Sequence, residues 1–98
     1  MKEITTVELQ ELLEKGDQLH LIDVREADEV AEGMIPSAIH IPLGEVPERM
    51  SELDKEKAYI MICRSGGRSG RATEFLTAEG YDVTNMVGGM LEWAGATE

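Results

Sequence analysis

The residues of this 98-residue chain that can do chemistry are concentrated in residues 63–71, which contain one cysteine, three arginines and three glycines. The segment follows an apolar run and precedes a helical pattern. Backbone N–H groups converge at such a strand-to-helix junction, and the helix dipole there favours negative charge. Gly66 and Gly67 permit the positive φ angles that an inward-pointing ring of N–H groups requires. The segment therefore predicts an anion-binding loop around the sulfur of Cys63.

Charge is distributed unevenly around this loop. The formal net charge is −11, from 20 acidic and 9 basic side chains, yet residues 57–73 contain four cations and no acid. That segment carries +4 and the rest of the chain carries −15. A chain this acidic repels nucleic-acid phosphates and anionic lipids at long range, so we expect no nucleic acid and no membrane as partner. A small anion bound at the loop is the expected ligand.

The predicted loop would make Cys63 a nucleophile. A free thiol with a pKa of about 8.5 is roughly 3% ionised at pH 7, whereas cysteines at helix N-termini or beside arginine have much lower pKa values. A decrease of about two pKa units would make the group mostly thiolate, so no histidine base would be required. A lone cysteine at a strand end is usually a small buried hydrophobe. Three arginines within nine residues have no purpose in a structural turn, and they favour the catalytic interpretation.

Short apolar runs with β-branched residues, bounded by charges, glycine or proline, predict strands over residues 19–24, 38–41, 58–63 and 82–87. Strands that alternate with helices favour a parallel sheet covered on both faces. We therefore predict one α/β domain over residues 1–98, with a central, mostly parallel sheet of about five short strands and helices on both faces. Pro36, Pro42 and Pro47 fall where the periodic signal is weakest, and this stretch is expected to wrap the surface.

Helical spacing of apolar residues occurs between the strands. It predicts a first helix before residue 16 and further helices over residues 27–32 and 69–79. Thr5 and Glu8 have the spacing of a capping box at the start of the first helix. Gly16, Gly33 and Gly80 stand where the three helices would end.

Three segments resemble the rhodanese family of sulfurtransferases. Segments within residues 21–43 resemble the family's first signature, residues 63–69 its active loop, and residues 87–90 with Trp93 its C-terminal signature. The resemblance implies an α/β fold with a parallel sheet and a catalytic Cys63. It also implies an anion site made by the backbone of the loop and by the two arginine side chains that it contains, with substrate-binding residues Arg64, Ser65, Gly66, Gly67, Arg68 and Ser69.

The resemblance further implies a single-domain thiosulfate sulfurtransferase. A small anionic sulfur donor would transfer sulfur to Cys63, and the resulting persulfide would pass it to cyanide or a thiol. One alternative is a persulfide carrier or regulatory module that binds a partner protein of a sulfur relay and turns over slowly alone. A cysteine phosphatase or arsenate reductase is less favoured, since cysteine phosphatases carry arginine six places after the cysteine. Here the arginine is Arg68, five places on, and the sixth position is Ser69.

Two positions depart from the family pattern. Met34 stands where the family usually has histidine, and Ser37 where it usually has glycine. Asp23, Arg25 and Glu26 follow a predicted strand and should lie on the same sheet edge as the loop. We favour a structural ion pair or helix cap for these three over a role in orienting substrate.

We expect no metal and no cofactor, because the single cysteine has no histidine near it in sequence. The apolar runs are short and the N-terminus lacks the pattern of a signal peptide, so we expect a cytoplasmic protein. His20 and His40 are expected to be packed or edge histidines rather than catalytic bases, and Trp93 and the methionines to fill the core. Gly88 and Gly89 fit equally well a plain turn or a close approach to the site.

Overall fold

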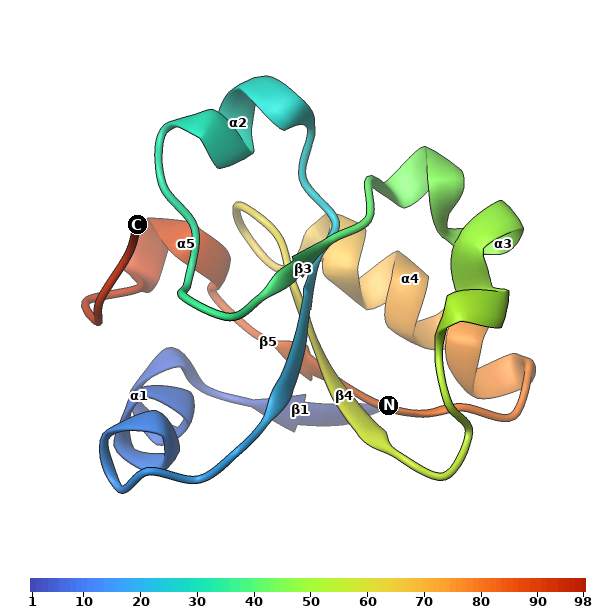
Figure 1. The fold of residues 1–98 in the computed structure, drawn as a ribbon, viewed down its shortest axis with the longest axis horizontal. Helices are drawn as coiled ribbons and strands as arrows, with labels where there is room; N and C mark the ends of the chain where they lie inside the picture. The colour runs from blue at the N-terminus through green and yellow to red at the C-terminus, as the bar shows by residue number, and fades with distance from the viewer.

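Five strands form the sheet at the centre of the structure (Figure 1). The computed structural model describes all 98 residues. The strands are β1 (Lys2–Ile4), β2 (His20–Asp23), β3 (Ile39–His40), β4 (Ala58–Ile62) and β5 (Asp82–Met86). They lie in the order β1-β5-β4-β2-β3, and every neighbouring pair is parallel. The predicted α/β class with a parallel sheet is confirmed.

Four helices connect the strands, α1 (Thr6–Glu14), α2 (Ala27–Ala31), α3 (Val46–Arg49) and α4 (Gly67–Ala78), and a fifth, α5 (Gly89–Glu92), follows β5. The predicted capping box at the start of α1 is present, since the N–H of Glu8 donates to Oγ1 of Thr5 at 3.1 Å and the N–H of Thr5 donates to the Glu8 carboxylate at 2.9 Å. The helix predicted from residue 69 begins two residues earlier, at Gly67. Its N-cap is Gly66, whose φ of 101° lies in the left-handed region that favours glycine.

Two parts of the fold differ from the prediction. The first strand, β1, has only three residues, too few to show an alternating pattern, and it forms by pairing with β5. The proline-containing stretch forms a compact helical segment, in which the 3₁₀ turns η1 (Leu43–Glu45) and η2 (Met50–Glu52) flank α3. Pro47 lies in the first turn of α3, where its missing N–H costs no hydrogen bond.

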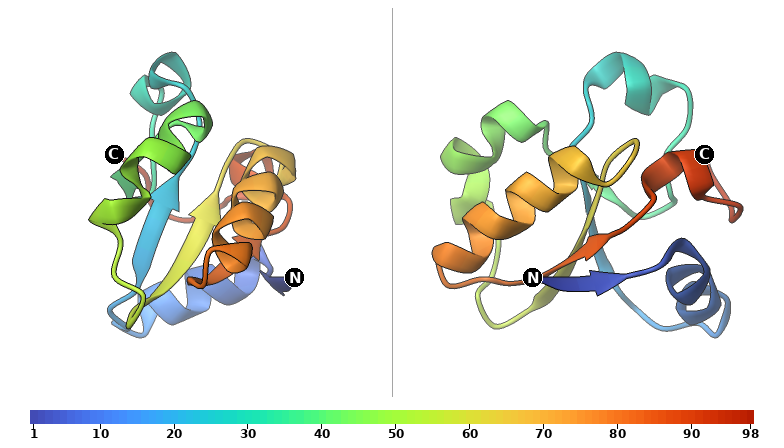
Figure 2. Two further views of the ribbon diagram at one scale, coloured as in Figure 1. Left: turned by 90° about the vertical axis from the view of Figure 1, so that its right-hand side faces the viewer. Right: turned by 180° about the vertical axis from the view of Figure 1, so that it is seen from behind.

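Helices cover both faces of the sheet (Figures 1 and 2). Alternation along β4 sends Tyr59, Met61 and the following Cys63 into a core cluster with α3 and α4, whereas Ile60 and Ile62 face a second cluster with α1 and α5. Cys63 therefore lies on the α4 side of the sheet. No helix in the structure is long and apolar enough to cross a bilayer.

The two departures from the family pattern lie in the connection between α2 and β3. Ser37 has a φ of 71°, which explains why glycine would be favoured at this position. The backbone of Met34 pairs with that of Glu98 through hydrogen bonds of 3.1 and 2.9 Å. The Met34 position thus anchors the C-terminal segment beside α2.

Candidate active site

Cys63 lies directly after β4, at the carboxyl edge of the sheet, and is fully buried. The chain then turns through Arg64 and Ser65 and enters α4 through the left-handed N-cap Gly66. This is the strand-to-helix position predicted from the sequence. Of the six residues expected to bind substrate, 64–69, three form hydrogen bonds to the sulfur: Ser65, Gly66 and Ser69.

Hydrogen bonds converge on the sulfur. The N–H of Gly66 donates to Sγ of Cys63 at 3.0 Å, and the Ser69 hydroxyl lies 3.4 Å from it. Burial raises the pKa of Cys63, but the Ser69 hydroxyl and the N–H groups of Ser69, Gly66 and Ser65 together outweigh burial, so the pKa lies below its ordinary value. We expected arginine charge to contribute, but the largest lowering contributions come from these hydrogen bonds. The loop therefore favours a thiolate.

Asn85 on β5 connects the loop to the sheet, and the sequence analysis missed it. Its Oδ1 lies 2.5 Å from the Ser69 hydroxyl, and its Nδ2 donates to the Gly66 carbonyl at 3.2 Å. Ser69 and Asn85 are both buried. The only signal in the sequence was a polar residue on the inward-facing side of an apolar strand.

The β5–α5 turn supports the loop from behind. The N–H of Met90 donates to the Cys63 carbonyl at 2.8 Å, and that of Leu91 donates to the Arg64 carbonyl at 2.9 Å. A Cβ on Gly89 would lie 2.4 Å from the carbonyl carbon and oxygen of Arg64. Both readings left open for this pair apply, since Gly89 brings backbone close to the site and Gly88, with φ of 85°, is the N-cap of the strand-to-helix turn.

The three arginines of the loop have different surroundings. Arg68 forms a bidentate pair with Glu29 of α2, with distances of 2.6 and 2.7 Å. Arg64 and Arg71 are exposed and make no ion pair. Arg64 lines a depression of about 390 Å³ between α2 and α5, and Arg71 lines one of about 360 Å³ beside Gly66 and Gly67.

The ion pair and the helix cap that the sequence favours for Asp23, Arg25 and Glu26 are present at the end of β2. Arg25 and Asp23 form a buried pair with distances of 2.8 to 3.1 Å, and Arg25 also donates to the Gly33 carbonyl at 2.8 Å. Glu26 is the N-cap of α2, in a capping box with Glu29. These contacts fix α2 beside the loop.

The histidines play no part in the thiol's hydrogen bonds. Nε2 of His40 lies 2.7 Å from the carbonyl of Arg25, and His20 packs against Tyr59 with ring centroids 5.7 Å apart. His40 is half-buried and His20 is exposed at the start of β2, so they fit the packed or edge positions expected for them.

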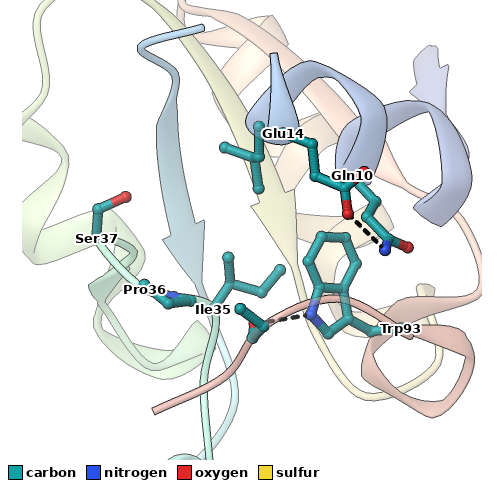
Figure 3. A pocket seen from close by; sticks show the side chains of 8 residues that line it. Gln10, Glu14, Ile35, Pro36, Ser37 and Trp93 are labelled. Carbon is teal, nitrogen blue, oxygen red and sulfur yellow. Dashed lines mark hydrogen bonds between the residues drawn. The ribbon is translucent and has the colours of Figure 1, made fainter. Parts of the chain in front are cut away.

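A second, more apolar pocket of about 320 Å³ lies between α1 and the C-terminal segment (Figure 3). It is lined by Gln10, Leu13, Glu14, Ile35, Pro36, Ser37, Trp93 and Ala96. Trp93 packs against the second core cluster, as expected, and its indole N–H donates to the Ala96 carbonyl at 3.0 Å. This pocket shares no residue with the Cys63 loop.

Comparison with known proteins agrees with this geometry. The Rhodanese-like domain family matches residues 5–96, so the chain belongs to that family. The chain is similar to YtwF of Bacillus subtilis (strain 168), provisionally named a sulfurtransferase, with 51% identity over 98 residues, 100% of this chain and 95% of YtwF. It is 39% identical over 95 residues to a sulfurtransferase of Allochromatium vinosum, covering 96% of this chain and 89% of that protein. These names support a function of the sulfurtransferase type.

Comparison with solved structures also agrees with the rhodanese-like fold. The crystal structure of a rhodanese-like domain protein from Staphylococcus aureus superposes with a TM-score of 0.95 at 37% identity. The match covers 100% of this chain and 97% of that one.

Proposed function

We propose that this protein is a thiosulfate sulfurtransferase that moves a sulfane sulfur through a Cys63 persulfide. The observation that carries the proposal is the surroundings of the sulfur, with the Gly66 N–H at 3.0 Å and the Ser69 hydroxyl at 3.4 Å at the start of α4. Hydrogen-bond donors that point at one buried sulfur atom stabilise a thiolate before the reaction and a persulfide anion after it.

In the first step the Cys63 thiolate attacks the outer sulfur of thiosulfate. An Sγ–S bond forms, the S–S bond of thiosulfate breaks, and sulfite leaves with the electron pair. The total charge is unchanged, since a thiolate and a dianion become a persulfide anion and a dianion. The loop N–H groups and the side chains of Arg64 and Arg68 are the proposed donor-binding groups.

In the second step cyanide or a thiolate attacks the outer sulfur of the persulfide. Thiocyanate or a new persulfide leaves, and the Cys63 thiolate is restored. Because Cys63 has no solvent exposure in this state, the loop residues must move aside before either reactant touches the sulfur.

Two further relatives bear on the substrate. The chain is 31% identical to the thiosulfate sulfurtransferase GlpE of Coxiella burnetii over 94% of its length, which supports thiosulfate as donor. It is 38% identical to YrkF of Bacillus subtilis, provisionally named a sulfur carrier protein, of which it spans 52%. The second candidate function is therefore a persulfide carrier that passes sulfur to a relay protein.

Intact-protein mass spectrometry tests the proposal. Cys63 is the only cysteine, so no internal disulfide can release the sulfur. Thiosulfate without acceptor should yield a lasting species heavier by one sulfur atom, and cyanide should restore the parent mass with stoichiometric thiocyanate. An unchanged mass with sulfite release at the turnover rate would disprove the persulfide mechanism. A stable persulfide that cyanide removes slowly would favour the carrier.

A further inference from the structure

The ion pair between Glu29 and Arg68 lies beside the proposed site, since Arg68 belongs to the Cys63 loop and Glu29 lines the same depression as Arg64. It joins α2 to the first turn of α4 across 39 positions of sequence. Nη1 and Nη2 of Arg68 each donate to one oxygen of the carboxylate, at 2.6 and 2.7 Å. Both terminal nitrogens of the guanidinium are therefore engaged by a group that belongs to the protein.

Glu29 is held firmly in this position. Its Oε1 also accepts from the N–H of Glu26 at 3.0 Å, and its own carbonyl lies 3.3 Å from Nη1 of Arg25. The Arg68 hydrogen bonds, followed by that of Glu26, lower the pKa of Glu29 to about 2. The carboxylate is thus ionised throughout the neutral range, and its side chain is only 24% exposed.

This arrangement removes positive charge where a dianion would need it. A sulfonate-type oxyanion binds guanidinium through two parallel hydrogen bonds, as a carboxylate does. Glu29 already occupies that edge of Arg68, and Asp23 likewise pairs with Arg25. Arg25 and Glu29 line the same depression as Arg64, and of its two arginines Arg64 is the one without a carboxylate partner.

We infer that Glu29 is a specificity-determining residue: by pairing with Arg68 it lowers the affinity of the Cys63 loop for dianionic sulfur donors, and so lets organic persulfides serve as donors beside thiosulfate. The inference rests on the proposed function and refines its substrate class. The Cys63 thiolate would attack the outer sulfur of R–S–S⁻, the S–S bond would break, and the thiolate R–S⁻ would leave with the electron pair.

Kinetics of Glu29→Gln test this inference, with Glu32→Gln as the matched control. Both substitutions remove one negative charge from the border of the same depression, but Glu32 makes no contact with Arg68. Glu29→Gln should lower KM for thiosulfate at least fivefold with kcat little changed, and Glu32→Gln less than twofold. KM for 2-hydroxyethyl persulfide should change less than twofold in both variants.

A double variant shows whether Glu29 acts through Arg68. The gain in thiosulfate affinity should be absent when Glu29→Gln is combined with Arg68→Ala. Equal gains from Glu29→Gln and Glu32→Gln would overturn the inference in favour of a general charge effect. A loss with both donors, together with a lower unfolding temperature, would show that the pair only holds α2 in place.

Protection of Cys63 from iodoacetamide by sulfate separates this inference from the proposed function, because the measurement needs no sulfur transfer. Sulfate should protect Glu29→Gln at a severalfold lower concentration than it protects the parent or Glu32→Gln. If that result appears but no persulfide forms in any variant, the sulfurtransferase proposal fails and the selectivity against dianions stands. If persulfide forms and all three proteins show equal protection, the inference fails and the proposed function stands.

Discussion

Two neighbouring strands, β4 and β5, end in turns that share one local geometry and differ in what they do. Each enters a helix through a glycine N-cap in the left-handed region, Gly66 with φ of 101° and Gly88 with φ of 85°. Residues 63–65 separate β4 from its N-cap, whereas Val87 alone separates β5 from its own. The longer turn encloses a side chain, and the shorter one has no room for it.

The backbone N–H groups at the starts of the two helices donate to different kinds of acceptor. At α4 the Gly66 N–H reaches the sulfur of Cys63, while at α5 the N–H groups of Met90 and Leu91 bond the carbonyls of Cys63 and Arg64. In a trans peptide the carbonyl and the following N–H point in opposite directions. Holding the Arg64 carbonyl outward therefore turns the next N–H inward, where it lowers the pKa of Cys63. The β5–α5 turn thus orients the turn that contains Cys63.

The largest effect is expected from a change in the turn between β4 and α4, which contains Cys63. Cys63→Ser should lower thiosulfate–cyanide turnover by at least about a thousandfold, because a hydroxyl of similar size fills the loop but forms no anion at neutral pH. Circular dichroism should show an unchanged fold, and mass spectrometry should show no added sulfur. Turnover within tenfold of the parent would remove Cys63 from the mechanism.

The second-largest effect is expected from a change in the β5–α5 turn. Gly89→Ala places a Cβ 2.4 Å from the Arg64 carbonyl group, and backbone cannot yield as a flexible side chain does. We expect turnover to fall about 10- to 100-fold from loop displacement and the free energy of unfolding to fall by about 1–3 kcal/mol.

Gly16→Ala is the control for backbone strain at that site. Gly16 also has positive φ, 89°, but a Cβ there meets nothing within 4 Å. It should cost about 1–2 kcal/mol of stability and leave turnover unchanged. Equal turnover in the two variants would mean that the β5–α5 turn does not position the loop.

The comparison also explains what the sequence could predict. A single segment, residues 63–71, contains Cys63 together with the glycines and arginines of the loop. Its chemistry, and the strand-to-helix junction that holds it, were therefore predictable from the local sequence pattern. Asn85 and Glu29 reach the loop from 16 and 39 positions away, and although Glu29 belongs to the segment that resembles the first signature, nothing local indicates that it contacts the loop. The ion pair of Arg68 with Glu29 could not be predicted from the sequence for the same reason.

The fold shows the same division between local and distant information. The capping box of α1 and the glycines that end the helices are local signals, and the structure has them. The short strand β1 exists only because β5 offers it a partner, and three residues carry no periodic signal of their own. Long-range pairing, rather than propensity, decides such elements.

The smallest expected effect shows whether the Ser69 hydroxyl stabilises the Cys63 thiolate or holds the loop in position. Ser69→Ala removes a hydroxyl that lowers the pKa of Cys63, while the burial that raises this pKa remains, so the pKa should rise. The thiolate fraction then falls, and alkylation by iodoacetamide at pH 7 should slow about threefold to tenfold. At a pH above both pKa values each protein is fully thiolate, and the two rates should converge. Ser65→Ala, which removes an exposed hydroxyl and keeps its N–H, should follow the parent profile. A Ser69→Ala rate that stays low on the alkaline plateau would show that Ser69 acts through its bond to Asn85, holding the loop in shape rather than stabilising the anion.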